Sequence, residues 1–372
     1  MKIKGETINR TILYVLVSTS FEMMFGLGFV RAQTPGDKPS VVRLDPALDE
    51  LISSDAKLQV AKDGIGEGDG FTEGTNWVQH GKTGYLLFSD IPGNVVYKLT
   101  PDGTLSVYLD RSGYTGPFNG HTLLTAGGST ENGPFVQLGT DGLTLDPQGR
   151  LILCAFGDRA LERLEKDGKR TVLADSYEGK RFNGPNDAVV KKDGTIYFSD
   201  TFSGLRSAGP GLPKSLNKGL DQMYIFMIKD GKLSPAISDI KQTNGLAFSP
   251  DEKYLYANGG GGNYIRRYDV QPDDTVTNGR LLIDLSVDKS APGATDGMRV
   301  DSRGNIYSTG PGGVWIISPE GKHLGTILTP KTVANLTFGD PDWKTVYMAA
   351  HSAIYKIRVN TPGLPCNSCS SK

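Results

Sequence analysis

The chain has 372 residues, enough for one large all-β domain or two ordinary domains. Its 40 basic and 41 acidic residues balance, which excludes the strongly basic composition typical of a nucleic-acid-binding protein. The 48 glycines and 21 prolines lie between short apolar runs, a pattern typical of a turn-rich β protein.

Residues 1–32 have the features of a secretory signal peptide. Basic residues precede an apolar run over residues 11–30, and Ala32 ends a stretch that a signal peptidase would recognise. Glu22 interrupts the apolar run, so an uncleaved signal anchor is the alternative. We therefore predict an exported protein, periplasmic or extracellular, with no membrane segment beyond this one.

The next residues lead into the globular part of the chain. Residues 33–55 are expected to form a linker or N-terminal extension, because prolines and glycine interrupt regular structure there. Residues 57–61 alternate in polarity and predict a strand. We expect one domain over residues 56–359, followed by a tail over residues 360–372 that contains Cys366 and Cys369.

A short phrase of sequence recurs six times along this domain. Each copy has an Asp, Glu or Asn, in most copies followed by Gly, then an apolar strand, a turn and a second strand. The copies begin at Glu73, Asp141, Asn186, Asn244, Asp296 and Asn335. Further short strands follow within the copies, several of them with Asp-Gly or Glu-Gly turns that favour tight hairpins. A four-stranded unit of about 40–50 residues is typical of a propeller blade.

We therefore predict an all-β fold, a six-bladed β-propeller. The last copy has only three clear strands, and the strand at residues 57–61 is expected to pair with it and close the ring. A β-sandwich is the alternative, but it does not account for six copies of one phrase. Two insertions, at residues 111–139 and 202–220, are expected to form loops on the binding face.

Equivalent positions in the six blades would form a ring at one mouth of the central channel. The residues that begin the copies are three carboxylates and three carboxamides, with no Lys or Arg among them. Like charges at close range are costly unless a cation lies among them. Such oxygen ligands suit one divalent cation, Ca²⁺ first and then Mg²⁺ or Mn²⁺, with Zn²⁺ as a further alternative. For any one of these residues alone, a turn-forming role is the competing interpretation.

Four motifs give the chain a resemblance to a known family: Phe71-Thr72-Glu73-Gly74-Thr75-Asn76-Trp77, Arg181-Phe182-Asn183-Gly184-Pro185-Asn186-Asp187, Thr243-Asn244-Gly245-Leu246-Ala247-Phe248-Ser249-Pro250-Asp251 and Thr295-Asp296-Gly297-Met298. In these motifs the chain resembles the SMP-30/gluconolactonase/luciferin-regenerating-enzyme family, most closely its bacterial gluconolactonase branch. The resemblance covers about residues 50–358. It implies a six-bladed propeller with one catalytic divalent metal.

The resemblance also implies roles for individual residues. Three residues correspond by motif to the metal ligands: Glu73, Asn244 and Asp296. Asn186 corresponds to a further ligand or a substrate contact, and Arg181 and Asn183 to substrate contacts. Asp296 is in addition the implied general base. His121, in the first insertion, is a candidate substrate contact, with an exposed loop histidine as the alternative.

The implied reaction is hydrolysis of a sugar-type, gluconolactone-like lactone. The metal would polarise the ester carbonyl, and Asp296 would take a proton from the attacking water. We expect Asp296→Ala to abolish turnover and Asn335→Ala to have little effect. The expected partner is a small-molecule lactone and not a nucleic acid, and the protein is expected to be a monomer or a dimer.

Two other interpretations stay open at this point. A non-catalytic propeller, stabilised by Ca²⁺, could bind a small molecule or a protein, because a fold does not decide a function. A related esterase could use the same scaffold.

Two departures from the family pattern bear on the substrate. Thr75 stands where relatives often have Pro, and Ala155-Phe156 follows Cys154 where many gluconolactonases carry Glu-His. Cys154 itself is expected to be a small buried hydrophobe. The departures leave the predicted metal site in place and bear on which lactone is used.

Overall fold

The computed structural model describes residues 40–116, 126–130, 133–201, 219–259 and 262–365. All of them belong to one unit, Pro39–Lys372. They form strands almost throughout, with one short helix, α1 (Leu48–Leu51), and one 3₁₀ turn, η1 (Ile65–Gly68). No helix within these ranges is long and apolar enough to cross a bilayer. The predicted signal peptide, His121 and the Cys366/Cys369 pair lie outside the described residues.

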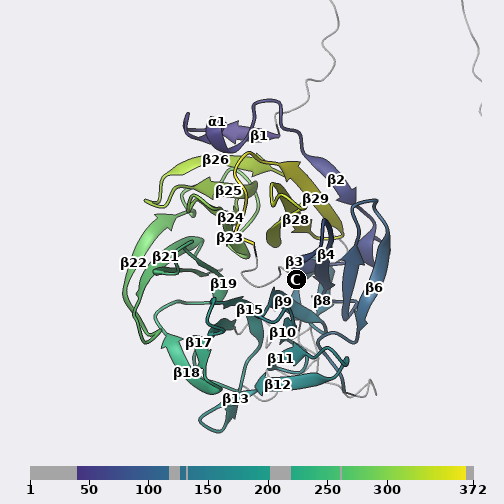
Figure 1. Ribbon diagram of the computed structural model, residues 1–372, viewed down its shortest axis with the longest axis vertical. Helices are drawn as coiled ribbons and strands as arrows, with labels where there is room; N and C mark the ends of the chain where they lie inside the picture. The colour runs from purple at the N-terminus through teal and green to yellow at the C-terminus, as the bar shows by residue number, and fades with distance from the viewer. Residues whose placement is uncertain (1–39, 117–125, 131–132, 202–218, 260–261, 366–372) are drawn as a thin grey trace, which may run out of the picture. The chain divides into compact units, whose positions relative to one another are not determined.

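Each of the six repeats forms one antiparallel sheet, and the sheets are arranged around a central axis (Figure 1). The first three blades consist of β3 (Thr72–His80), β4 (Thr83–Asp90), β5 (Val95–Leu99) and β6 (Leu105–Asp110), then β9 (Thr140–Leu145), β10 (Leu151–Ala155), β11 (Ala160–Leu164) and β12 (Arg170–Ala174), then β15 (Pro185–Val190), β16 (Ile196–Asp200), β17 (Tyr224–Lys229) and β18 (Lys232–Ile237). The last three consist of β19 (Thr243–Phe248), β20 (Tyr254–Gly259), β21 (Tyr264–Val270) and β22 (Val276–Asp284), then β23 (Met298–Val300), β24 (Ile306–Gly310), β25 (Gly313–Ile317) and β26 (His323–Leu328), then β27 (Asn335–Gly339), β28 (Thr345–Ala350) and β29 (Ala353–Arg358). This arrangement confirms the predicted six-bladed propeller.

An N-terminal strand closes the circle of blades. Strand β2 (Gln59–Lys62) pairs with β29 of the last blade, with Val60 opposite Tyr355. The last blade thereby gains the fourth strand that its own repeat lacks, as predicted, and β2 covers a sheet edge that would otherwise be open. Trp77 of the first blade stacks on Tyr347 of the last, with ring centroids 5.7 Å apart.

The residues just before β2, predicted to be a linker or extension, include a strand and a helix that pack on the propeller. Strand β1 (Val41–Arg43) pairs with β26 and adds a fifth strand to the fifth blade, with Val42 opposite Thr326. Helix α1 follows and buries Leu48 and Leu51 against this blade and the next. In Figure 1, β1 and α1 lie outside β26.

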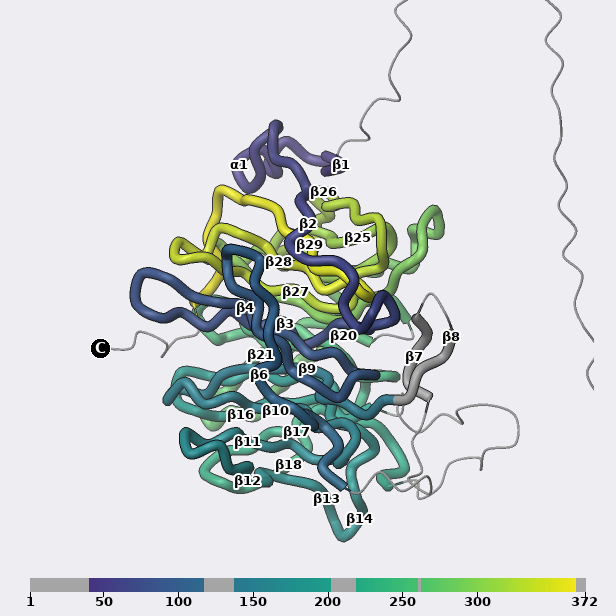
Figure 2. Tube along the Cα trace, turned by 90° about the vertical axis from the view of Figure 1, so that its right-hand side faces the viewer, coloured from purple at the N-terminus to yellow at the C-terminus, as the bar shows by residue number. Residues whose placement is uncertain are grey.

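Two short hairpins interrupt the blade pattern. One is formed by β7 (Ala126–Thr130) and β8 (Gly133–Val136), within the first predicted insertion. The other is formed by β13 (Ser176–Tyr177) and β14 (Lys180–Arg181), just before the third inner strand. Figure 2 shows the blades edge-on, with the β13–β14 hairpin projecting beyond the sheets.

Aspartates that follow strands form turns in this structure. Asp146 accepts hydrogen bonds through Oδ1 from the N–H groups of Gln148 (2.9 Å) and Arg150 (2.8 Å). Asp301 does the same for Arg303 and Asn305, at 2.9 Å each. These contacts fix tight turns and occupy the carboxylates.

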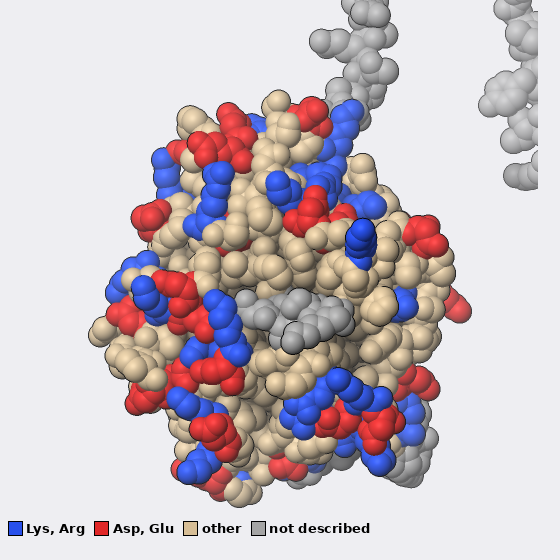
Figure 3. Space-filling model, in the orientation of Figure 1, with Lys and Arg blue, Asp and Glu red and all other residues tan. Residues whose placement is uncertain are grey.

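The charged surface is mixed in sign. On the face that Figure 3 shows, Lys and Arg side chains are interspersed with Asp and Glu side chains over several blades. This distribution agrees with the near balance of 40 basic and 41 acidic residues in the whole chain.

Candidate functional site

The six residues that begin the repeats lie at the starts of the innermost strands. Five of them are in or at the first residues of β3, β9, β15, β19 and β27, and Asp296 lies two residues before β23. Glu73, Asp141, Asn186 and Asn335 are buried, whereas Asn244 and Asp296 are partly exposed. We call these six residues the ring.

Glycines let neighbouring inner strands approach closely at the ring. A methyl group on the glycine that follows one ring residue would overlap the ring residue of the next blade. This holds for Gly74 against Asp141, Gly142 against Asn186, Gly245 against Asp296 and Gly297 against Asn335. The recurring Gly of the sequence phrase is therefore explained by backbone proximity.

The ring residues are joined in carboxylate–carboxamide pairs between adjacent blades. The side-chain amide of Asn186 donates to Oδ2 of Asp141 at 2.8 Å, and that of Asn335 donates to Oε2 of Glu73 at 2.8 Å. Asp296 accepts a side-chain hydrogen bond from Asn244. The structure therefore brings all six residues together, with each carboxylate partnered by one amide.

Burial and mutual repulsion disfavour the ionised form of the ring carboxylates. Burial raises the pKa of Glu73 to about 7, although its hydrogen bonds favour the charged form. Burial, and then the charges of Glu73, Asp141 and Asp187, raises the pKa of Asp296 well above its ordinary value. Burial and the charge of Glu73 act in the same direction on the pKa of Asp141. A cation among these groups would favour their charged forms.

The backbone of Asp296 is held from two sides. Its N–H donates to the Thr309 hydroxyl at 2.7 Å, and its carbonyl oxygen accepts from the Asn258 amide at 2.5 Å. Asn258 in turn accepts from the N–H of Gly245 at 3.0 Å. The backbone of Asp296 is therefore fixed, and the residue as a whole is partly exposed.

Arg299 supplies a positive charge that the ring positions themselves lack. It follows Asp296 by three residues, and its guanidinium donates to the carbonyl oxygens of Met298 (2.8 Å) and Thr75 (3.1 Å). Burial raises the pKa of Glu73 and of Asp187, and the charge of Arg299 opposes this rise in both. The ring thus has a protein cation in its neighbourhood, which reduces the carboxylate repulsion only in part.

The donor set of the ring fits a hard divalent cation when the amide oxygens are counted. Within the described ranges, no three His, Cys, Asp or Glu side chains form a metal-binding group by themselves. The Oδ1 atom of Asn186, however, is buried with no hydrogen-bond partner among the described residues. Oε1 of Glu73 likewise accepts no hydrogen bond there, since both of its bonds are made through Oε2. Such unsatisfied oxygens are what a Ca²⁺-type ion binds.

The predicted substrate contacts lie in different settings. Arg181 is exposed at the end of β14 and donates to the carbonyl oxygen of Asp158 at 2.6 Å. Asn183 is fully buried, and its amide donates to Asp200 (3.2 Å) and to the Leu220 carbonyl oxygen (3.3 Å). Asn183 therefore forms part of the wall behind the mouth, while Arg181 is accessible.

Asp200 is a residue whose role the sequence left open. Its carboxylate accepts from the N–H groups of Asn183 (3.1 Å) and Gly184 (2.8 Å), so it holds the segment that leads to Asn186. Burial raises the pKa of Asp200 to about 7, against these hydrogen bonds. Only its place after a strand and beside the second insertion could have pointed to it.

The residues that depart from the family pattern, Thr75 and Phe156, contact residues in or near the ring. The hydroxyl of Thr75 donates to Oδ1 of Asn335 at 3.1 Å, so Thr75 adds a hydrogen bond to the ring. The ring of Phe156 lies directly over Gly184, where a methyl group would overlap it. Cys154 is fully buried in β10, as expected for a small hydrophobe.

The SMP-30/gluconolactonase/LRE-like region is a family model that matches residues 71–352 of this chain. The chain belongs to this family. The gluconolactonase of Zymomonas mobilis is 30% identical over 332 residues, which are 87% of this chain and 87% of that protein.

Two solved structures of family members are also similar. A protein described as a putative gluconolactonase is 30% identical with a TM-score of 0.71, over 87% of this chain and 99% of its own. A gluconolactonase from Xanthomonas campestris is 28% identical with a TM-score of 0.70, over 87% of this chain and 96% of its own.

Proposed function

We propose that this protein hydrolyses a sugar-type lactone at the ring, with Asp296 as the general base. Glu73, Asn186, Asn244 and Asp296 would hold one divalent cation, with Ca²⁺ as the first candidate. The observation that carries the proposal is the gathering of buried carboxylates and carboxamides at the channel mouth, with an unsatisfied oxygen on Asn186.

The general class of the reaction rests on the family. Relatives that align over most of this chain include the gluconolactonases of Zymomonas mobilis and Xanthomonas campestris. The protein is accordingly a lactonase, an enzyme that opens a cyclic ester with water. The choice of a sugar-type substrate follows these relatives and is part of the proposal.

When bound, a divalent cation would supply Lewis-acid polarisation of the ester carbonyl. Asp296 would accept a proton from the attacking water, whose oxygen then forms a bond to the carbonyl carbon. The C–O bond within the lactone breaks, and the departing oxygen takes up a proton to give the free hydroxy acid. A bound cation would lower the pKa of Asp296 from the raised value that burial gives it, so the carboxylate would be ionised and able to accept a proton.

The chain's own residues fix this arrangement. Thr309 and Asn258 hold the Asp296 backbone, and Asn335 and Asn186 orient the carboxylates of Glu73 and Asp141. Pre-organisation of this kind aligns a base with its substrate before reaction. Arg181, exposed at the end of β14, is the proposed donor to hydroxyl or carbonyl groups of a lactone.

The proposal is tested by acid release from three classes of lactone: a sugar lactone such as glucono-1,5-lactone, an aliphatic lactone and an aromatic lactone. Each is measured in a pH-stat with enzyme passed over a chelating resin, and again after Ca²⁺, Mg²⁺, Mn²⁺ or Zn²⁺ is added. Spontaneous hydrolysis without enzyme is subtracted. We expect cation-dependent hydrolysis that is fastest for the sugar lactone.

Different outcomes identify the competing interpretations. Cation-dependent hydrolysis confined to the aliphatic or aromatic lactone would indicate a related esterase on the same scaffold. No cation-dependent acid release from any of the three would indicate a non-catalytic propeller.

A further inference from the structure

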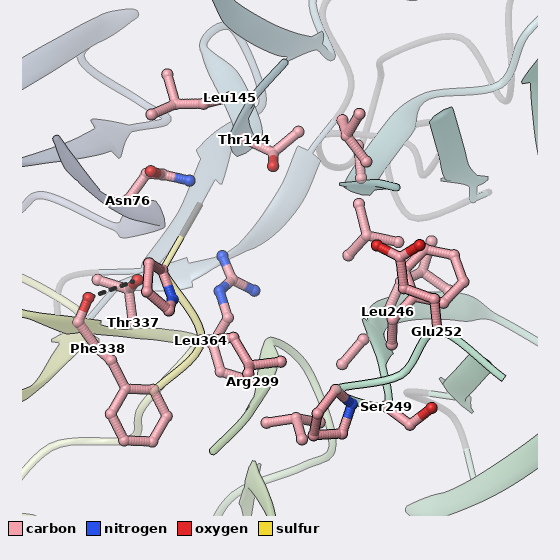
Figure 4. Close-up of a pocket in the computed structure, with 18 of the residues that line it drawn as sticks. Asn76, Thr144, Leu145, Leu246, Ser249, Glu252, Arg299, Thr337, Phe338 and Leu364 are labelled. Carbon is pink, nitrogen blue, oxygen red and sulfur yellow. Dashed lines mark hydrogen bonds between the residues drawn. The ribbon is translucent and has the colours of Figure 1, made fainter. Parts of the chain in front are cut away.

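A cavity of about 220 Å³ lies at the mouth of the channel opposite the ring (Figure 4). All six inner strands contribute to its lining, from residues that follow the ring positions along each strand. The inner strands begin at the ring, so residues further along each strand approach the other mouth. None of the six ring residues lines this cavity.

The cavity contains one guanidinium group with unused donors. Arg299 lines it, and Figure 4 shows its side chain extending between Asn76 and Leu246. A guanidinium has five N–H donors, and Arg299 uses Nη1 and Nη2 for one backbone carbonyl oxygen each. It makes no ion pair with any residue that the structure describes. Donors therefore remain for a ligand, in the planar arrangement that matches a carboxylate.

The remaining walls are mixed in polarity, with polar groups such as Asn76 and Ser249 beside apolar residues. Leu145, Val189, Phe248 and Phe338 contribute hydrocarbon surface to the cavity. Lys192 is exposed and Glu252 is partly exposed in the lining, so with Arg299 the cavity holds two cationic side chains and one carboxylate, a net positive charge that would attract an anion. The volume is below the roughly 300–1,000 Å³ of pockets that hold drug-sized ligands, so a smaller molecule is indicated.

We propose that this cavity is a binding site for a small carboxylate with an apolar body, such as a short aliphatic acid. The carboxylate lies on the Arg299 guanidinium, and the hydrocarbon chain packs against Leu145, Val189 and Phe338. The hydrocarbon part of the lining offers an amphipathic anion contacts that inorganic phosphate cannot make, and the additional charge of phosphate would lie in a cavity that also holds the Glu252 carboxylate. No ring residue lines this site, although the charge of Arg299 also acts on Glu73, and binding here does not depend on lactone hydrolysis.

The test is calorimetric titration of the full chain with hexanoate, after passage over a chelating resin so that no cation in the ring binds the probe. Hexan-1-ol and inorganic phosphate serve as matched probes, one without the charge and one without the chain. We expect saturable binding of hexanoate that is at least about tenfold tighter than binding of either control. Equal binding of hexanol or of phosphate would overturn the proposal.

Two variants test whether hexanoate binds in this cavity. Arg299→Met removes the anchor and should weaken hexanoate binding by at least about tenfold. Thr144→Phe fills the cavity from a partly exposed position whose side chain makes no hydrogen bond with the described residues, and should abolish binding. Asp296→Asn, at the other mouth, should bind hexanoate as the wild type does. Undiminished binding in a folded Arg299→Met or Thr144→Phe protein, or loss of binding in Asp296→Asn alone, would contradict the assignment.

Discussion

Asn335 donates its side-chain amide to Oε2 of Glu73 at 2.8 Å, across the junction of the last and first blades. The same Asn335 accepts from the Thr75 hydroxyl and, at 2.8 Å, from the N–H of Leu336. A residue with no assigned chemistry thus orients a predicted metal ligand at the point where the propeller closes.

Asn335→Ala is therefore expected to be costly, contrary to the small effect anticipated from the sequence. The change leaves the buried Thr75 hydroxyl without its partner, at a cost of about 1–3 kcal/mol, and removes one of the two hydrogen bonds that Oε2 of Glu73 accepts. We expect a loss of at least about 2 kcal/mol in the free energy of unfolding, measured with urea. Cation affinity and turnover should also fall, because Glu73 loses its orienting donor.

Thr337→Ala is the matched control in the same strand. Its hydroxyl donates only to the neighbouring Phe338 carbonyl, at 3.3 Å. We expect less than about 1 kcal/mol of destabilisation and unchanged turnover. An Asn335→Ala protein that matches this control in stability and activity would contradict the role given to Asn335.

Gly245→Ala tests whether close approach of the inner strands positions Asp296. A methyl group there would overlap the Asp296 carbonyl oxygen and crowd the Asn258 amide that holds it. We expect a stability loss of about 1–3 kcal/mol from overpacking. A displacement of about 1 Å would lower turnover by about 10²-fold.

Gly231→Ala provides the comparison, since a methyl group at Gly231 meets no atom within 4 Å. Its positive φ of 74° costs about 1–2 kcal/mol for a non-glycine residue, with no change in turnover. If both variants keep wild-type turnover, the close approach at Gly245 does not position Asp296.

Asp200 is expected to make stability depend on pH. Burial raises its pKa in the folded protein to about 7, from 3.8. The folded state therefore binds the proton more tightly, and the free energy of unfolding falls as the pH rises from about 4 to 7. The loss amounts to about 1.4 kcal/mol for each unit of pKa difference.

Asp200→Asn removes this titration. The stability difference between wild type and variant should shift in favour of the variant from pH 5 to pH 8, measured by urea unfolding at each pH. Asp251→Asn is the control, because its side-chain contact with Ser249 lowers the pKa of Asp251 and it stays ionised over this range. For Asp251→Asn, the stability difference from wild type should not change with pH. The same pH-independence for Asp200→Asn would show that Asp200 does not have a raised pKa in the folded protein.

The sequence predicts the six blades and their closure because the signal repeats at fixed positions. The Asp, Glu or Asn of each repeat, and the Gly that follows it in four of the six, occur where neighbouring strands meet, so one pattern specifies both the fold and the ring. Strand β2 could be predicted because the last repeat visibly lacks a strand.

Other features depend on contacts between distant residues and could not be read from local pattern. Strand β1 has only three residues, and its partner β26 follows more than 270 residues later. Arg299 lies between the buried residues Met298 and Val300, so a charge within an inner strand was its only signal. The full burial of Asn183 follows from its contacts with Asp200 and the Leu220 carbonyl, which no local sequence pattern shows.

The central claim is that Asp296 is both a cation ligand and the general base, and Asp296→Asn tests it most directly. Asn is nearly isosteric, and the backbone contacts to Thr309 and Asn258 do not involve the carboxylate, so the fold should persist. The measurement is kcat/KM for cation-dependent hydrolysis of the sugar lactone, with thermal unfolding as a check on folding. We predict a folded variant whose kcat/KM falls by at least about 10²-fold. A folded Asp296→Asn protein with wild-type, cation-dependent turnover would contradict the account.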